Sequence, residues 1–157
     1  MRKRISVISI VAMTALLLAL GLTSAALADG NGAPRVTTLS GAEEVPARNT
    51  PASGFASIRL NVGQGTVCWE LTYSGLLAPA TAAHIHAAPA GVNGGVVVPL
   101  SVSPTTTGGS SGCREGVNPA LIQAIIDFPE NYYVNVHTSM FPGGEIRGQL
   151  SNRGQSQ

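Results

Sequence analysis

The sequence predicts an all-β fold, an antiparallel β-sandwich of about seven strands with one short helix. Three observations support this class. Several segments alternate apolar and polar residues with a period of two, as half-buried strands do. The chain contains 19 glycines and 10 prolines, and clusters of them separate those segments as turns. Only one segment, 118–127, has the pattern of a helix.

The first 28 residues have the pattern of an export signal. A basic start at residues 2–4 precedes an apolar run over 5–22, and Ala26-Leu27-Ala28 matches the A-x-A cleavage pattern. We therefore expect a signal peptide at 1–28 and a mature chain that begins at Asp29. An uncleaved membrane anchor is the alternative, because the apolar run is about long enough to span a bilayer.

Removal of this segment changes the charge of the chain. The full sequence has 9 Lys and Arg against 8 Asp and Glu, and loss of residues 2–4 leaves 6 against 8, with no lysine. No basic patch then exists to neutralise phosphates, so a nucleic-acid partner is not expected. After cleavage no membrane segment is expected either, and the remaining length suits one domain.

In the first half of the mature chain we predict a linker, a strand and a hairpin. We expect a flexible linker at 29–35 and a first strand over 36–39. Glu43 and Glu44 follow in a loop interrupted by prolines, where they are predicted either to be solvated or to protect a sheet edge. Strands over 56–62 and 67–73 alternate clearly, and a glycine turn between them indicates a hairpin. Trp69, in the middle of the second strand, is expected in the core.

The second half begins with a segment that contains His84 and His86. A short apolar strand over 96–98 is expected to end at Pro99, and a mobile loop of serine, threonine and glycine is expected over 101–112.

A helix over 118–127 is predicted next, with Asn118 as its N-cap and Pro119 in the first helical position. A strand over 132–137 and a last strand over 145–150 complete the fold. A disordered tail is expected over 151–157.

Cys68 and Cys113 are the two cysteines of the chain. In an exported protein such a pair predicts a disulfide, with Cys113 in a loop that folds back over the strand of Cys68. A zinc-binding pair is the less favoured alternative, because there is no CxxC spacing. The bridge would close a loop of about 46 residues, which the chain-entropy model values at roughly 4 kcal/mol.

The three histidines of the chain are the candidate site. Residues i and i+2 of a strand point to the same face, so His84 and His86 can direct both rings to one point. We expect His137 on the adjoining strand, within reach of both. Three imidazoles with one open position can bind copper or zinc. The alternative is a structural cluster that hydrogen-bonds to neighbours such as Asn135, Thr138, Glu145 or Arg147.

The carboxylates of the chain offer further candidate ligands, but no catalytic motif accompanies them. Glu70 and Glu145 are candidate oxygen ligands, and Glu145 shares a strand face with Arg147, with which it can form an ion pair. There is no G-x-S-x-G or comparable nucleophile setting, and the glycines near residue 93 lack the G-K-[ST] of a phosphate loop. The sequence therefore does not predict an enzyme.

Several motifs occur in the order found in a known family, the chordin-type (CHRD) domain. The chain resembles this domain over 36–150, through Leu39-Ser40-Gly41-Ala42-Glu43-Glu44-Val45-Pro46, Gly54-Phe55-Ala56, Ala83-His84-Ile85-His86, Asn93-Gly94-Gly95-Val96-Val97, Tyr133-Val134-Asn135-Val136-His137-Thr138 and Pro142-Gly143-Gly144-Glu145-Ile146-Arg147-Gly148-Gln149-Leu150. The resemblance implies an extracellular domain with a Greek-key β-sandwich distantly similar to Cu/Zn superoxide dismutase. For free-standing microbial copies it implies no settled activity.

Compared with a Cu/Zn dismutase, His84 and His86 match the H-x-H strand and His137 can stand for a late histidine. A bridging histidine and a zinc loop have no counterpart, so dismutase activity is not expected.

Two functions follow as expectations. The first is a secreted or extracytoplasmic, cell-envelope-associated interaction module whose partner is an extracellular protein or a cell-envelope component. The alternative is an exported copper- or zinc-binding protein that uses the three histidines and is redox-active.

Overall fold

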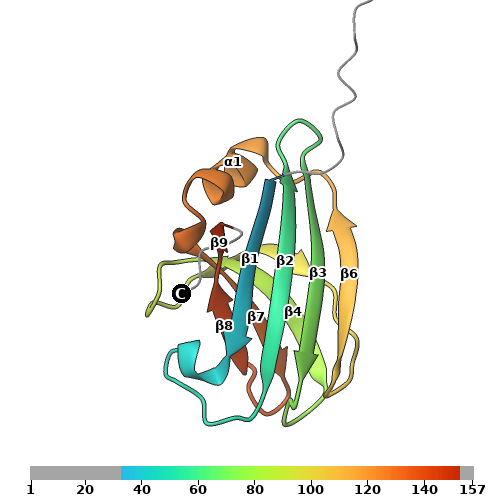
Figure 1. The fold of residues 1–157 in the computed structure, drawn as a ribbon, viewed down its shortest axis with the longest axis vertical. Helices are drawn as coiled ribbons and strands as arrows, with labels where there is room; N and C mark the ends of the chain where they lie inside the picture. Colours follow the sequence, from blue (N-terminus) through green and yellow to red (C-terminus); the bar gives the residue numbers. More distant parts are fainter. Residues whose placement is uncertain (1–32, 153–157) are drawn as a thin grey trace, which may run out of the picture.

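The computed structural model describes residues 33–152, and over these residues it contains nine β-strands, one α-helix and two short 3₁₀ helices (Figure 1). The strands are β1 (Ala33–Ser40), β2 (Ser53–Asn61), β3 (Thr66–Ser74), β4 (Ala80–Ala87), β5 (Gly95–Leu100), β6 (Gly108–Arg114), β7 (Tyr132–Thr138), β8 (Ile146–Gln149) and β9 (Ser151–Asn152). The helices are α1 (Pro119–Asp127), η1 (Gly41–Glu43) and η2 (Pro129–Asn131). The predicted all-β antiparallel class with one short α-helix is confirmed. The predicted signal peptide lies outside the described residues.

The described strands form one continuous sheet in which the pairings are antiparallel. Its order is β5-β4-β7-β8-β1-β2-β3-β6, and β9 pairs with β1. The two edge strands, β5 and β6, also lie close together. The Arg114 side chain of β6 donates a hydrogen bond to the Pro99 carbonyl of β5 at 3.4 Å. The sheet therefore curls into a nearly closed barrel, with β1, β2, β3 and β6 on one side and β4, β7 and β8 on the other (Figure 1).

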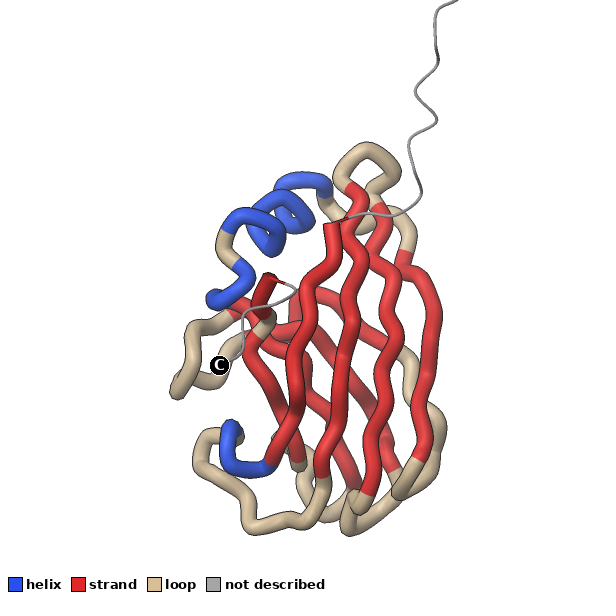
Figure 2. The backbone as a smooth tube through the Cα atoms, in the orientation of Figure 1, coloured by secondary structure: helices blue, strands red, loops and turns tan. Residues whose placement is uncertain are grey.

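The apolar core fills the inside of this barrel. Strand β3 shows the predicted alternation, since Trp69 and Leu71 are buried and Glu70 and Thr72 are exposed. Helix α1 lies at one end of the barrel (Figure 2) and buries two isoleucines in the same core. Its predicted cap is confirmed, because the Asn118 side chain accepts a hydrogen bond from the backbone N–H of Ala120 at 2.9 Å. Among the described residues, no helix is long and apolar enough to cross a membrane.

Strand β6 corrects the prediction of a loop over 101–112. Residues 108–114 pair with β3, and Cys68 lies directly opposite Cys113, to which the predicted disulfide joins it with an S–S distance of 2.08 Å. Cys113 is therefore in a strand and not in a loop. The strand reads GGSSGCR and has no apolar alternation to reveal it. One of its glycines has a packing cause, since a Cβ at Gly112 would lie 2.7 Å from the Trp69 ring.

Three predicted boundaries also differ from the structure. Strand β1 begins at Ala33, inside the predicted linker 29–35, because it pairs along its full length with β2. Strand β5 continues through Pro99, which an edge strand tolerates because the missing N–H is not needed there. Ser151 and Asn152, predicted to be part of the tail 151–157, form β9 by pairing with β1. Residues 29–32 and 153–157 lie outside the described part of the chain.

Candidate functional site

The three histidines lie on the outer face of the β4–β7 pair. In the register of these strands His84 is opposite Asn135, His86 is opposite Tyr133 and His137 is opposite Ala82. Directly opposed residues point to the same side of an antiparallel sheet. The intervening residues, such as Ile85, are fully buried in the barrel core. The predicted placement of His137 on the strand next to His84 and His86 is therefore confirmed.

This outer face is itself covered, which alternation alone does not predict. All but the first residue of β7 and all residues of β8 are buried, whereas β3 alternates between buried and exposed positions. Loop segments 41–52, 88–94 and 139–145 supply the hydrogen-bond partners of the polar side chains on this face. The molecule thus has a second, polar layer outside the barrel, and the histidines belong to it.

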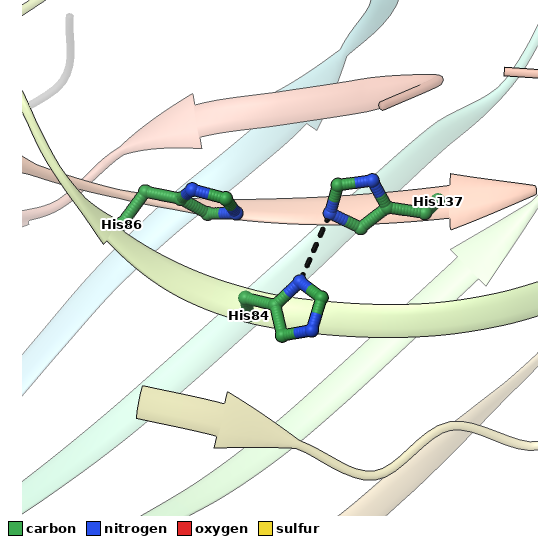
Figure 3. Close-up of side chains that lie close together, drawn as sticks. All are labelled: His84, His86 and His137. Carbon is green, nitrogen blue, oxygen red and sulfur yellow. Dashed lines mark hydrogen bonds between the residues drawn. The ribbon is translucent and has the colours of Figure 1, made fainter. Parts of the chain in front are cut away.

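The rings of His84, His86 and His137 face one another (Figure 3). His84 Nδ1 lies 3.1 Å from His137 Nε2, in a hydrogen bond. One ring nitrogen from each of the three histidines can be chosen so that all lie within 4.8 Å of one another. Within the part of the chain that the structure describes, no other group of three or more His, Cys, Asp and Glu side chains is gathered so closely.

Two backbone carbonyls fix the orientation of two of the rings. His86 Nδ1 is 3.0 Å from the Gly94 carbonyl oxygen, and His137 Nδ1 is 2.9 Å from the Pro142 carbonyl oxygen. A carbonyl only accepts, so each Nδ1 must carry the proton in the neutral ring, and each Nε2 presents its lone pair. His137 Nε2 accepts from His84 Nδ1–H, but the buried His86 Nε2 has no hydrogen-bond partner among the described residues.

Burial keeps all three imidazoles neutral at ordinary pH. Desolvation is the main cause that lowers the pKa of each ring, and for His84 the pKa falls to about 4, with further lowering by the neighbouring His137 and His86. The carbonyls of Gly94 and Pro142 act in the opposite direction on the pKa values of His86 and His137, because they accept from the ring N–H. His86 and His137 are buried, whereas His84 is half-buried, so the cluster is accessible at His84.

Tyr133 and Arg147 support the ring of His86. The Tyr133 ring stacks on His86 with centroids 4.8 Å apart and an angle of 7° between the planes. The Arg147 guanidinium lies over Tyr133, 4.3 Å from the ring centroid. Arg147 is 2 % exposed and donates hydrogen bonds to the Val92 carbonyl and the Asn93 side-chain oxygen. No pattern in the sequence indicates this role, although Arg147 occurs in one of the motifs that carry the resemblance.

The candidate carboxylate ligands are elsewhere. Glu70 is exposed on β3 and forms an ion pair with Arg59 at 3.2 Å. Glu145 is fully buried, and its oxygens accept hydrogen bonds from Thr50, the Leu77 N–H and Thr138. The predicted ion pair between Glu145 and Arg147 was therefore wrong, because hydroxyl and amide donors surround the carboxylate.

The prediction that Glu44 is solvated is also wrong, since its side chain is buried and only 5 % exposed. Burial is the largest influence and raises its pKa to about 7, although the nearby charges of Arg147 and Arg48 lower the pKa. Its carboxylate and the Asn135 side chain meet beside Gly144, where an added Cβ would lie 2.5–2.6 Å from both. Gly144 has a φ of +123°, so glycine is required there for both conformation and space. No periodicity in the sequence indicates that a loop folds Glu44 onto this face.

This arrangement offers three neutral nitrogen donors, two of them already oriented, at a partly accessible point of the surface. Such a donor set is suited to a transition-metal ion. The family model of the CHRD domain matches residues 35–150, which include every residue of the site. No curated protein and no solved structure matches the chain.

Proposed function

The chain belongs to the CHRD domain family, and on that basis we propose that it is an exported binding module whose ligand is a copper or zinc ion. His84, His86 and His137 would hold the ion. The family and the Cys68–Cys113 disulfide both support a location outside the cytoplasm, where such bridges persist. The proposal keeps the binding role that the family suggests and assigns a ligand to it.

The buried Nε2 atom of His86 is the observation that carries this proposal. A histidine with a purely structural role normally satisfies both nitrogens when buried, since an unpaired buried polar atom costs about 1–3 kcal/mol. Here Nδ1 is bonded to the Gly94 carbonyl, and Nε2 faces the other two rings without a partner. A metal ion is the ligand that accounts for this third nitrogen as well as for the other two.

The spacing of the rings supports the same conclusion. Two imidazole nitrogens bound to one tetrahedral zinc ion, each at about 2.0–2.1 Å, lie about 3.3 Å apart. The observed separation of His84 Nδ1 and His137 Nε2 is 3.1 Å. Because His84 Nδ1–H donates to His137 Nε2, metal binding through His84 Nδ1 requires that proton to move to His84 Nε2, and otherwise His84 Nε2 is the ligand atom.

Copper and zinc are the proposed ions because three imidazoles, with no thiolate or carboxylate among them, suit both, and because the affinity of divalent ions for such donors is highest for copper. A bound copper or zinc ion would supply Lewis acidity, and copper would also supply one-electron chemistry. The chain's own residues bind the ion, orient two of the rings through backbone carbonyls and exclude water from the side of His86 and His137.

We also propose that the barrel has Greek-key order. If the approach of β5 and β6 is counted as a neighbour relation, β7 lies beside β4 and the spatial order is 7-4-5-6. This order is the Greek-key arrangement of three consecutive strands and a fourth that returns beside the first. It supports the sandwich similar to Cu/Zn dismutase that the resemblance implies, at the level of strand order only.

The second candidate is a module that binds an extracellular protein or a cell-envelope component and in which the histidines are structural. Exposed apolar side chains near the site favour it. Val96 is paired with His86 and is 51 % exposed, and Val92, in the preceding loop, is 49 % exposed. Isolated exposed valines are common on protein surfaces, so the proposal of metal binding has the stronger support.

Calorimetry on the metal-stripped mature protein distinguishes the two candidates. We expect the wild type to take up one equivalent of Cu²⁺ or Zn²⁺ at neutral pH, and we expect His86→Ala to lose most of that affinity. Thr81→Ala, which changes an exposed residue of the same strand, should bind like the wild type. The absence of uptake by the wild type, or unchanged uptake by His86→Ala, would refute metal binding. If the wild type takes up no metal and the free energy of unfolding of His86→Ala is lower by roughly 1–3 kcal/mol, the cluster is structural.

A further inference from the structure

The carbonyl that orients His86 belongs to a loop and needs a support of its own. Gly94 lies between β4 and β5, and its N–H donates to the Tyr133 hydroxyl at 3.1 Å while its carbonyl accepts from His86. A Cβ at this position would lie 2.1 Å from the Ala87 carbonyl oxygen, so only glycine fits. The position of the Gly94 carbonyl therefore decides the orientation of the His86 ring.

Asn93 connects this loop to the rest of the polar layer. Its side-chain nitrogen donates to the Val45 carbonyl at 2.8 Å, and its side-chain oxygen accepts from Arg147 at 3.1 Å. Both polar atoms of the amide are thus hydrogen-bonded, although Asn93 is exposed. The residue next to Gly94 is bonded on one side to the loop that follows η1 and on the other side to β8.

Arg147 reaches the ring of His86 by two routes. Through the Val92 carbonyl and Asn93 it holds the backbone that ends at Gly94. Through its contact with the face of Tyr133 it holds the ring that stacks on His86. The two routes act on the same imidazole, and neither involves a direct hydrogen bond between Arg147 and a histidine.

We infer that Asn93 and Arg147 are positioning residues that set the affinity of the histidine site for its metal ion, and this inference rests on the proposed function. The effect passes through the Gly94 carbonyl, which fixes the proton on His86 Nδ1 and directs Nε2 toward His84 and His137. Partners that orient metal-binding histidines in this way typically contribute about 10–100-fold to metal affinity.

Two substitutions at Asn93 test the inference without changing a ligand or a buried residue. Asn93→Ala removes both hydrogen bonds, and we expect it to weaken Zn²⁺ binding about 10–100-fold. Asn93→Asp keeps the oxygen that accepts from Arg147 but loses the N–H that donates to the Val45 carbonyl, and we expect its affinity to lie between those of Asn93→Ala and the wild type. Asn61→Ala is the matched control, because it removes one side-chain hydrogen bond, to the Gln64 N–H, in the distant β2–β3 turn.

Nitrogen NMR of the metal-free proteins supplies a readout that a purely structural role would not change. We expect Asn93→Ala to redistribute the His86 proton between its two ring nitrogens while the His137 signals, which depend on the Pro142 carbonyl, stay as in the wild type. Equal Zn²⁺ affinity of Asn93→Ala and the wild type, or equal weakening by the Asn61→Ala control, would overturn the inference. If the wild type itself takes up no metal, the proposed function fails, and the NMR result alone decides whether Asn93 positions His86.

Discussion

Replacement of Glu44 by glutamine should stabilise the protein at pH 8, although it removes a buried negative charge near two arginines. Burial raises the pKa of Glu44 from its ordinary value of 4.5 to about 7. The folded protein therefore keeps a proton at pH values where the unfolded chain has already lost it. The stability that this group contributes is complete below about pH 4.5, falls as the pH rises toward 7, and is constant above that pH. Glutamine cannot ionise and does not show this loss.

The size of the effect follows from the two pKa values. Their difference corresponds to roughly 3 kcal/mol at about 1.36 kcal/mol for each pH unit. Solvent screening at a loop reduces this to about 1–2 kcal/mol. We therefore expect Glu44→Gln and the wild type to have nearly equal free energies of unfolding at pH 4.5. At pH 8 we expect Glu44→Gln to be about 1–2 kcal/mol more stable.

Urea unfolding of the metal-free proteins at pH 4.5, 6 and 8 measures this difference. The histidines also titrate, and since burial lowers the pKa of each, their contribution to stability is lost as the pH falls below about 6.5. That loss is common to both proteins and cancels in the comparison. Glu43→Gln is the matched control, because Glu43 is the exposed neighbour and should change stability little at any of the three pH values.

The opposite result would refute the reasoning. Removal of one partner from a well-formed buried ion pair typically destabilises a protein by about 3–5 kcal/mol. If Glu44→Gln is less stable than the wild type at pH 8, then attraction to Arg147 and Arg48 outweighs desolvation, and Glu44 is a structural counter-ion. An unchanged difference between pH 4.5 and pH 8 would exclude a raised pKa.

Two further predictions concern the covalent state of the chain. Thiol titration of the denatured, unreduced protein should find no free cysteine, and reduction of the Cys68–Cys113 bridge should lower the free energy of unfolding by about 4 kcal/mol, whereas two free thiols in exported material would contradict the pairing. N-terminal sequencing of the exported protein should begin at Asp29, and a retained Met1 would indicate an anchor.

The sequence predicts those elements whose local pattern agrees with their final environment. The β2–β3 hairpin has one buried and one exposed face, so its alternation is visible, and the Asn118-Pro119 start marks helix α1. The shared face of His84 and His86 follows from the period of a strand, and the adjacency of His137 follows from the same period together with the family resemblance. The Cys68–Cys113 disulfide followed from composition and context.

The missed features depend on contacts between distant segments. Strand β6 has glycine where it packs against Trp69, so pairing with β3 decides its conformation and no apolar pattern does. Glu44 lies in the segment that follows β1, and it is buried because this segment folds over the outer face of β4, β7 and β8. Local periodicity contains no information about such a cover.

The polar layer outside β4, β7 and β8 divides into two parts by the partners of its atoms. The buried oxygens of Glu145 and the side-chain nitrogen of Gln149 are satisfied by groups of the protein itself, so their burial is stable without any ligand. His86 Nε2 has no such partner, and neither have Glu44 Oε1 and Asn135 Oδ1 of the same layer. The His86 ring is nevertheless held by the Gly94 carbonyl and by stacking on Tyr133, which Arg147 supports. An unpaired buried nitrogen lowers the stability of the fold, by about 1–3 kcal/mol for a typical buried polar atom. The proposed metal ion would offset this cost, because a ligand that binds the folded state alone adds to its stability.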